Sequence, residues 1–229
     1  MPPQAVFLMP RKVAGVLSVR CEIKNYSVLQ KKLEDMKKAP RKVMDSVTAD
    51  AKKRVPGWVA AEVTKVYGVK KGEITGQKIG RVKPEGTSFK DVRIVYTGRV
   101  LTPTHFNMSP KEPNPGGGYT LKATIIKGQR TTLGKVKKLT KKQRAALAKN
   151  FTGSGTRQSD HSPIMLMRAN GGQYLPFQRK STNRRDIEAV KTISLPQMVS
   201  SQRTEEGIQR AISEGLEKRL EHHMNRFMG

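Results

Sequence analysis

The residues that could bind a metal or transfer a proton are few and poorly spaced. The chain has four histidines, and His222 and His223 are adjacent. Neighbouring residues on a helix point about 100° apart, which disfavours binding of one ion by both rings. Cys21 is the single cysteine and has no partner at a metal-ligand spacing. We therefore expect no metal site, and we expect the two adjacent histidines to be solvated on a helix surface.

The carboxylates are too scattered for a catalytic pair. Asp and Glu are absent from residues 113–159, although a two-metal nuclease needs clustered carboxylates to hold its cations. The segment GQRTTLGKV, Gly128–Val136, approaches a phosphate-binding loop but has five residues between its glycines where the motif needs four. Val136 also lacks the hydroxyl that would bind Mg²⁺. We expect no enzyme activity, no catalytic residue and no cofactor.

The strongest chemical signal is positive charge. The chain carries 45 Lys+Arg against 18 Asp+Glu, a formal net charge of +27. A surplus of this size points to an anionic partner, with nucleic acid as the first candidate. It is densest in a basic segment at 127–149, which contains Lys127, Arg130, Lys135, Lys137, Lys138, Lys141, Lys142, Arg144 and Lys149.

Such a segment can neutralise phosphates, and the released counterions make binding salt-dependent and indifferent to sequence. Aromatic residues form only 5% of the chain, which argues against stacking on single-stranded bases, and no helix suited to reading the major groove stands out. The alternative is a solvated loop and helix face. The candidate nucleic-acid-facing residues are Lys135, Lys137, Lys138, Lys141, Lys142, Arg144, Arg179, Lys180, Arg184 and Arg185.

The elements that would position these residues begin with a strand and several helices. Residues 16–23 alternate with period two, which predicts a half-buried strand. Apolar residues at helical spacing follow, and this pattern is interrupted at Pro40 and at Pro56-Gly57. The pattern therefore predicts separate helices near 29–36, 43–54 and 58–68.

From Lys78 onward, short apolar alternations broken by Gly, Pro and Asn predict antiparallel strands. Strands are expected within 89–98, 104–110 and 119–128, with a long loop at 110–118 and a short helix capped by Thr140. An apolar hairpin is expected as a central strand pair, with its turn at Asn170-Gly171-Gly172. A third strand over 187–196 and one long helix over 196–228 complete the chain, and Ile208, Ile212, Leu216, Leu220 and Met224 recur every fourth residue on that helix.

These elements predict an α+β fold: N-terminal helices, then a twisted antiparallel sheet, then a long C-terminal helix. We expect an N-terminal extension with a strand at 1–27 and a single domain at 28–229. No apolar run is long enough to span a bilayer, and the first residues are a poor secretion signal. A single cysteine fits a reducing compartment. We expect no membrane contact and synthesis in the cytoplasm.

Four blocks occur in a defined order along residues 28–229. They are VTKVYGVKKGEI at 63–74, GRVLTPTHF at 98–106 before a strand ending in IIKGQRTTL, MLMRANGGQYLPFQRK at 165–180, and KTISLPQMV at 191–199 before a terminal helix. Taken together they resemble the phage minor tail protein Z family, the tail-completion proteins of tailed phages and phage-derived particles. The strand at 16–23 and the PNPGGG loop depart from the family pattern, and the basic segment is longer than that pattern demands.

This resemblance implies a structural virion protein at the head-proximal end of a tail, which completes the tail and joins it to the head, with DNA passing along its axis. It implies a homo-oligomeric ring, commonly sixfold, assembled in the host cytoplasm. The tail tube or tail terminator and the head–neck connector proteins would be its neighbours, and DNA would be met by non-specific electrostatic contact. The alternative is a sequence-independent nucleic-acid-binding protein associated with ribosomes or the nucleoid, which would explain the charge but not the ordered blocks.

Overall fold

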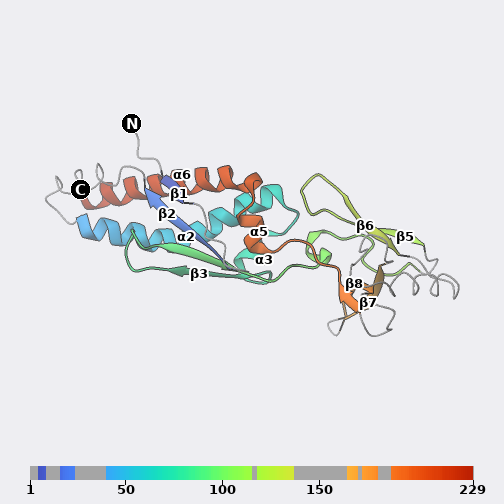
Figure 1. Ribbon diagram of the computed structural model, residues 1–229. Helices are drawn as coiled ribbons and strands as arrows, with labels where there is room; N and C mark the ends of the chain where they lie inside the picture. Colours follow the sequence, from blue (N-terminus) through green and yellow to red (C-terminus); the bar gives the residue numbers. More distant parts are fainter. Residues whose placement is uncertain are drawn as a thin grey trace. The chain divides into compact units, whose positions relative to one another are not determined.

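The computed structural model describes residues 5–8, 16–23, 40–114, 118–136, 164–169, 172–179 and 187–228. Helices and small antiparallel sheets make up an α+β fold with a long C-terminal helix, as the sequence predicts (Figure 1). The chain forms two compact units. Unit 1 comprises residues 1–66, 70–99 and 193–229, and unit 2 comprises residues 67–69 and 100–192.

Unit 1 contains a four-stranded antiparallel sheet in the order β1-β2-β4-β3. Its strands are β1 (Ala5–Leu8), β2 (Val16–Ile23), β3 (Arg81–Glu85) and β4 (Arg93–Thr97). Ile94 and Tyr96 alternate with more exposed residues along β4 and are fully buried, so one face of the sheet forms the core. Pro84 lies in the edge strand β3, where a missing N–H costs no ladder hydrogen bond.

Two long antiparallel helices pack against this sheet, α2 (Pro40–Val66) on β3 and β4 and α6 (Gln202–Met228) on β1. Each helix buries residues spaced three or four apart, the pattern of an amphipathic helix. The fully or nearly fully buried members are Val43, Val47, Ala51, Val55, Val59 and Val63 of α2 and Ile208, Ile212, Leu216 and Leu220 of α6. The apolar row predicted on the C-terminal helix is therefore confirmed, except that Met224 is only half-buried.

The predicted break at Pro56 is wrong, because α2 runs without interruption from Pro40 to Val66 and contains Pro56 inside it. Val55 and Val59, on either side of the proline, are both fully buried. Burial of this continuous apolar row against α6 and the sheet outweighs the loss of one helical hydrogen bond. Pro40 begins the helix, a position that proline tolerates well. The helix predicted near 29–36 lies outside the described residues.

The predicted single helix over 196–228 is also wrong, because two helices occupy this region. The first is α5 (Leu195–Val199), in which Ser194 and Gln197 form a reciprocal capping box: Ser194 N donates to Gln197 Oε1 at 2.9 Å, and Gln197 N donates to Ser194 Oγ at 3.4 Å. The chain then turns, and Thr204 Oγ1 donates to the carbonyl oxygen of Met198 at 2.7 Å. Side-chain hydrogen bonds of Ser and Thr to nearby backbone favour such a break.

Unit 2 contains a 3-10 helix, η1 (Pro103–Phe106), and two small sheets. One sheet is the hairpin of β5 (Tyr119–Ala123) and β6 (Thr131–Val136), and the other has the order β7-β8-β9, with β7 (Met165–Arg168), β8 (Tyr174–Arg179) and β9 (Ile187–Ala189). Met108, Leu121 and Ile164 form the buried centre of this unit, and Leu133, Val136, Leu166 and Val190 pack around them. Unit 2 therefore has a small hydrophobic core of its own.

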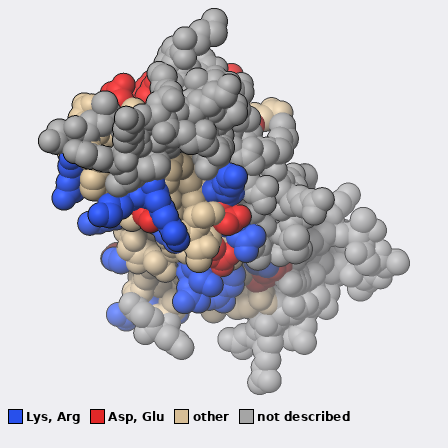
Figure 2. All heavy atoms as spheres, turned by 90° about the vertical axis from the view of Figure 1, so that its left-hand side faces the viewer, with Lys and Arg blue, Asp and Glu red and all other residues tan. Residues whose placement is uncertain are grey.

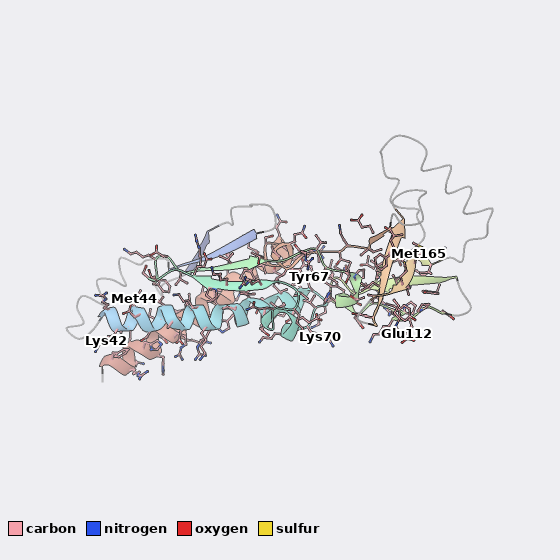
Figure 3. All side chains as sticks on the ribbon, turned by 90° about the horizontal axis from the view of Figure 1, so that it is seen from below. Lys42, Met44, Tyr67, Lys70, Glu112 and Met165 are labelled. Atoms are coloured by element: carbon pink, nitrogen blue, oxygen red, sulfur yellow. The ribbon has the colours of Figure 1, made fainter. Side chains whose placement is uncertain are left out.

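The apolar hairpin of unit 2 is confirmed as β7 and β8, which pair Met165 with Phe177 and Arg168 with Tyr174. Figure 3 labels Met165 on this hairpin. It is not a central strand pair, because β7 is the edge of its sheet and Met167 remains 41% exposed. The strand predicted within 104–110 is wrong: η1 occupies its start, and Asn107 has a left-handed φ of 49°.

The domain organisation of the structure differs from the one expected from the sequence. The strand expected in an N-terminal extension is β2, which pairs with β4 from Val16↔Thr97 to Arg20↔Arg93 and so lies inside the sheet of unit 1. A single domain was expected over 28–229, but the chain leaves unit 1 after Arg99 and returns to it at Ile193, and residues 67–69 also belong to unit 2. Unit 2 is thus inserted between elements of unit 1, which sequence periodicity does not reveal.

Candidate nucleic-acid interface

The hairpin β5–β6 contains the part of the basic segment that the structure describes. A turn joins the strands, in which Gln129 N donates to the carbonyl oxygen of Ile126 at 3.0 Å and Gly128 has φ 82°. A positive φ at this turn position favours glycine. Leu121 and Ala123 of β5 are fully buried, so the alternation of the strand directs Thr120 and Lys122 to the opposite face.

The outward face of this hairpin is cationic. Lys122 is paired in register with Thr132 and Thr120 with Lys135, and Leu133 is the extra residue of a bulge. Lys122 and Lys135 therefore lie diagonally on one face. Lys127 and Arg130 follow in the turn, and all four cationic side chains are exposed. We call Lys122, Lys127, Arg130 and Lys135 the hairpin cations.

The backbone beneath two of these cations is held on both sides. Lys122 exchanges two backbone hydrogen bonds with Ser109, at 2.8 and 3.0 Å, while it also pairs with β6. The carbonyl oxygen of Lys135 accepts a hydrogen bond from Ile164 N at 3.3 Å. The strands thus fix the positions of the charges, while the long side chains remain free to follow an irregular ligand surface.

The hairpin cations have no ion-pair partner among the described residues. The hairpin contains no Asp or Glu, and none of its cations takes part in a salt bridge there. Unit 1 differs, because Arg93 and Lys83 share Glu85 at 2.8 and 3.2 Å, and Figure 2 shows Lys and Arg beside Asp and Glu on one face of that unit. The hairpin cations are therefore available to an external anion.

The described hairpin has one aromatic residue, Tyr119, which is half-buried. Tyr119 begins β5, and its hydroxyl oxygen is buried. Burial raises the pKa of this phenol, as expected of a ring held against the protein interior. Threonine hydroxyls at 120, 131 and 132 accompany the cations instead. Cations and hydroxyls commonly bind phosphate and sugar oxygens, and such contacts carry no sequence information.

Of the residues predicted to face nucleic acid, Lys135 is exposed on β6, within the hairpin cations. Arg179 is the last residue of β8, where the structure describes only its backbone. The remaining predicted residues lie outside the described part of the chain: Lys137, Lys138, Lys141, Lys142, Arg144, Lys180, Arg184 and Arg185. Whether they join Lys135 on one surface stays a prediction. Sequence reasoning omitted Lys122, although the alternation of Leu121 and Ala123 around it would have indicated an outward lysine.

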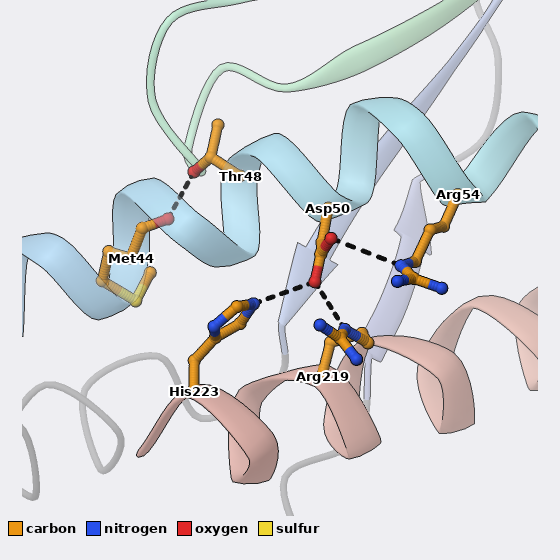
Figure 4. Close-up of polar contacts among 6 residues, drawn as sticks. All are labelled: Met44, Thr48, Asp50, Arg54, Arg219 and His223. Carbon is orange, nitrogen blue, oxygen red and sulfur yellow. Dashed lines mark hydrogen bonds and ion pairs between the residues drawn. The ribbon is translucent and has the colours of Figure 1, made fainter. Parts of the chain in front are cut away.

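A second polar site lies in unit 1, between α2 and α6 (Figure 4). Asp50 Oδ2 accepts from Arg219 Nε at 2.5 Å and lies 2.9 Å from His223 Nε2, while its Oδ1 accepts from Arg54 Nε at 3.3 Å. Burial raises the pKa of the Asp50 carboxyl, but the hydrogen bonds from His223, Arg219 and Arg54 outweigh it and lower the pKa from 3.8 to about 2. This carboxylate therefore stays ionised at neutral pH and ties the two helices together.

His223 corrects the expectation that both adjacent histidines are solvated. Its side chain is only 7% exposed, whereas His222 is exposed on the outer side of α6. The described residues contain no group of three or more His, Cys, Asp or Glu that could hold a metal ion. The site therefore has the composition of a structural ion-pair cluster, with more cationic partners than carboxylates.

No described helix has both the length and the apolar character needed to cross a membrane. Comparison with family models, with curated proteins and with solved structures found no match to this chain. The resemblance to tail-completion proteins therefore rests on the ordered sequence blocks alone.

Proposed function

We propose that this chain is a structural virion protein that completes the head-proximal end of a phage tail and joins it to the head, as a ring through which DNA passes. The ordered sequence blocks support the assignment to the tail. The observation that carries the DNA contact is the β5–β6 hairpin, which has four exposed cations and no acidic residue, with Lys122 and Lys135 on one face and Lys127 and Arg130 in the turn.

DNA that moves through a ring must be held by contacts that do not depend on its sequence. Lysine, arginine and hydroxyl groups that meet phosphates provide such contacts, because every step along the duplex offers the same charge. The hairpin has a single aromatic residue, the half-buried Tyr119, which fits the same role. The edge strand β7, which pairs with β8 alone among the described strands, gives neighbouring subunits of a ring a backbone surface to pair with.

The DNA contact is tested by replacing the hairpin cations with glutamine and measuring duplex affinity over a salt series. Each lost phosphate contact lowers the slope of log affinity against log salt by about 0.9, so four contacts predict a slope reduced by about 3 to 4. The matched control replaces Lys42, Lys53, Lys65 and Lys71, four exposed lysines of unit 1, and so removes the same charge. Equal slopes for the two variants would contradict a specific role for the hairpin.

A second variant neutralises Lys137, Lys138, Lys141 and Lys142, the predicted continuation of the basic segment. A further loss of affinity and slope is expected if these residues extend the same surface. An unchanged slope would assign them to an ordinary solvated segment.

Assembly is tested by light scattering and electron microscopy of the purified full chain, and by imaging of virions in which the chain has been located. A ring of defined symmetry at the head–tail joint is the expected result. A monomer that binds DNA with affinity independent of sequence would instead favour the alternative of a ribosome- or nucleoid-associated protein, which the hairpin cations also suit. A monomer with sequence-selective, salt-resistant binding would contradict both.

A further inference from the structure

The outer side of α6 carries a row of charges whose sign alternates. Glu206, Arg210, Glu214 and Lys218 are spaced by four residues, and all four are exposed. Residues four apart on a helix lie almost above one another, so these side chains form one line along the helix. The line lies apart from the buried row that begins at Ile208 and from the glycines that face α2. We call these four residues the α6 charge row.

The charges of this row are not satisfied by the described residues of the chain. Neighbouring members could pair along the helix as i,i+4 partners. However, no salt bridge or side-chain hydrogen bond joins any of them to a described residue, although Asp50, Glu62, Glu85 and Glu188 do form such pairs. The side chains of the row are therefore free to meet an external surface.

We propose that the α6 charge row binds the same row of a second copy of this chain, with the two helices antiparallel about a twofold axis between Arg210 and Glu214. In that arrangement Glu206 faces Lys218 of the second copy, and Arg210 faces its Glu214. The twofold axis repeats both contacts, so all four pairs are of opposite charge. Arg203 and Glu221 are also exposed and complementary in the same register.

Charge balance favours a second copy as the occupant. Residues 203–221 hold five Glu against four Lys+Arg, in a chain whose net charge is +27. Most surfaces of two such chains repel one another, but this segment does not, and its slight acidity disfavours DNA. A single helix face gives a small, polar interface, so the association is weak. This inference does not depend on the proposed function.

Charge reversal tests the pairing, with self-association of the full chain measured by sedimentation equilibrium at about 0.15 M salt, where net repulsion between chains is largely screened beyond about 8 Å. Glu206→Lys or Lys218→Glu alone places like charges opposite one another twice across the axis, so each single variant should associate about tenfold more weakly than the wild type, or worse. Mixing the two single variants restores opposite charges at both positions. The mixture should therefore form a heterodimer at least as tight as the wild-type dimer.

The double variant Glu206→Lys/Lys218→Glu separates this contact from pairing within one helix. Between two copies it exchanges the charges and keeps each pair complementary, so self-association should recover. Within one helix it places a positive charge one turn from Arg210 and a negative charge one turn from Glu214, so intrahelical pairing predicts the least stable helix of the set, measured by circular dichroism. A wild-type chain that stays monomeric at all concentrations, single variants that associate like the wild type, or a mixture that does not recover association would each overturn the proposal.

The hairpin variant keeps this test independent of the proposed function. Glutamine at the four hairpin cations removes DNA contacts but leaves the α6 charge row intact, so its self-association should match that of the wild type. Loss of DNA binding with normal association, or the reverse, then identifies which of the two proposals has failed.

Discussion

Replacing Asp50 with asparagine should reveal how much one carboxylate contributes to holding α2 against α6. The change keeps the shape of the side chain but leaves Arg219 and His223 facing a neutral amide. Lowering of the Asp50 pKa from 3.8 to about 2 corresponds to an upper limit of about 2 kcal/mol. Because the Asp50 side chain is still 16% exposed and that of Arg54 is 46% exposed, solvent screening reduces the expected loss to about 1–2 kcal/mol.

The pH dependence follows from the sign of this shift. A carboxyl whose pKa is lower in the folded state stabilises the fold above its unfolded pKa and loses that contribution as pH falls through the folded pKa. The difference between the wild type and Asp50→Asn should thus be full near pH 7, begin to shrink below about pH 4, and continue to shrink toward about pH 2.

Urea unfolding followed by tryptophan fluorescence measures the free energy of unfolding of unit 1, and so the difference between the wild type and Asp50→Asn. The chain has one tryptophan, Trp58, which lies in α2 against Gly215 of α6. Its fluorescence therefore reports the helix pair of unit 1. Asp45→Asn is the matched control, because Asp45 is an exposed residue of the same helix and has no ion pair with any described residue. The stabilising role of the Asp50 carboxylate would be refuted if Asp50→Asn lowered the free energy of unfolding no more than Asp45→Asn does. It would also be refuted if the loss of unfolding free energy were the same at pH 7 and pH 3.

Three further substitutions in unit 1 should change the free energy of unfolding, one lowering it and two raising it, and the same fluorescence assay measures each. Gly215→Ala should cost about 1–3 kcal/mol, because a Cβ there would lie 2.5 Å from the Trp58 ring. Gly57→Ala, with nothing within 4 Å of the added Cβ, should instead stabilise α2 by about 0.5–1 kcal/mol, and equal effects at the two glycines would contradict this account of the packing. Pro56→Ala should stabilise the helix by about 1 kcal/mol or more, since it restores an N–H donor inside α2; a destabilised variant would show that the proline is required for packing.

Strands that alternate over five or more residues could be predicted from the sequence. The period-two pattern correctly places the strands Arg93–Thr97 and Tyr119–Ala123. In such segments apolar residues alternate with polar ones, so the sequence itself indicates which face is buried. The same pattern misled at 104–110. Phe106 and Met108 are both buried, yet a turn of 3-10 helix followed by the left-handed Asn107 produces that alternation without a strand.

Helix boundaries were harder to predict, because local and tertiary preferences conflict there. Pro56 and Gly57 both disfavour a helix, and only the buried row of valines on either side of them shows why α2 continues. At Ser200 and Ser201 the conflict has the opposite outcome. The sequence on either side predicts one helix, but the structure has two, α5 and α6. The capping box at Ser194 and the hydrogen bond of Thr204 to Met198 stabilise the break between them.

The contact between α2 and α6 shows most clearly what a single sequence conceals. Asp50, Arg54, Trp58 and Glu62 are spaced by four residues on α2, beside rather than within the apolar row. Three of them have a counterpart on α6, because Asp50 meets Arg219 and His223, Trp58 lies on Gly215, and Glu62 lies against Gly207. Apart from Trp58, the residues named in both rows are polar or small, so hydrophobic periodicity gives no reason to bury them. Only the pairing of two segments distant in the sequence, with Asp50 and Arg219 169 residues apart, converts charged and small residues into a packed contact.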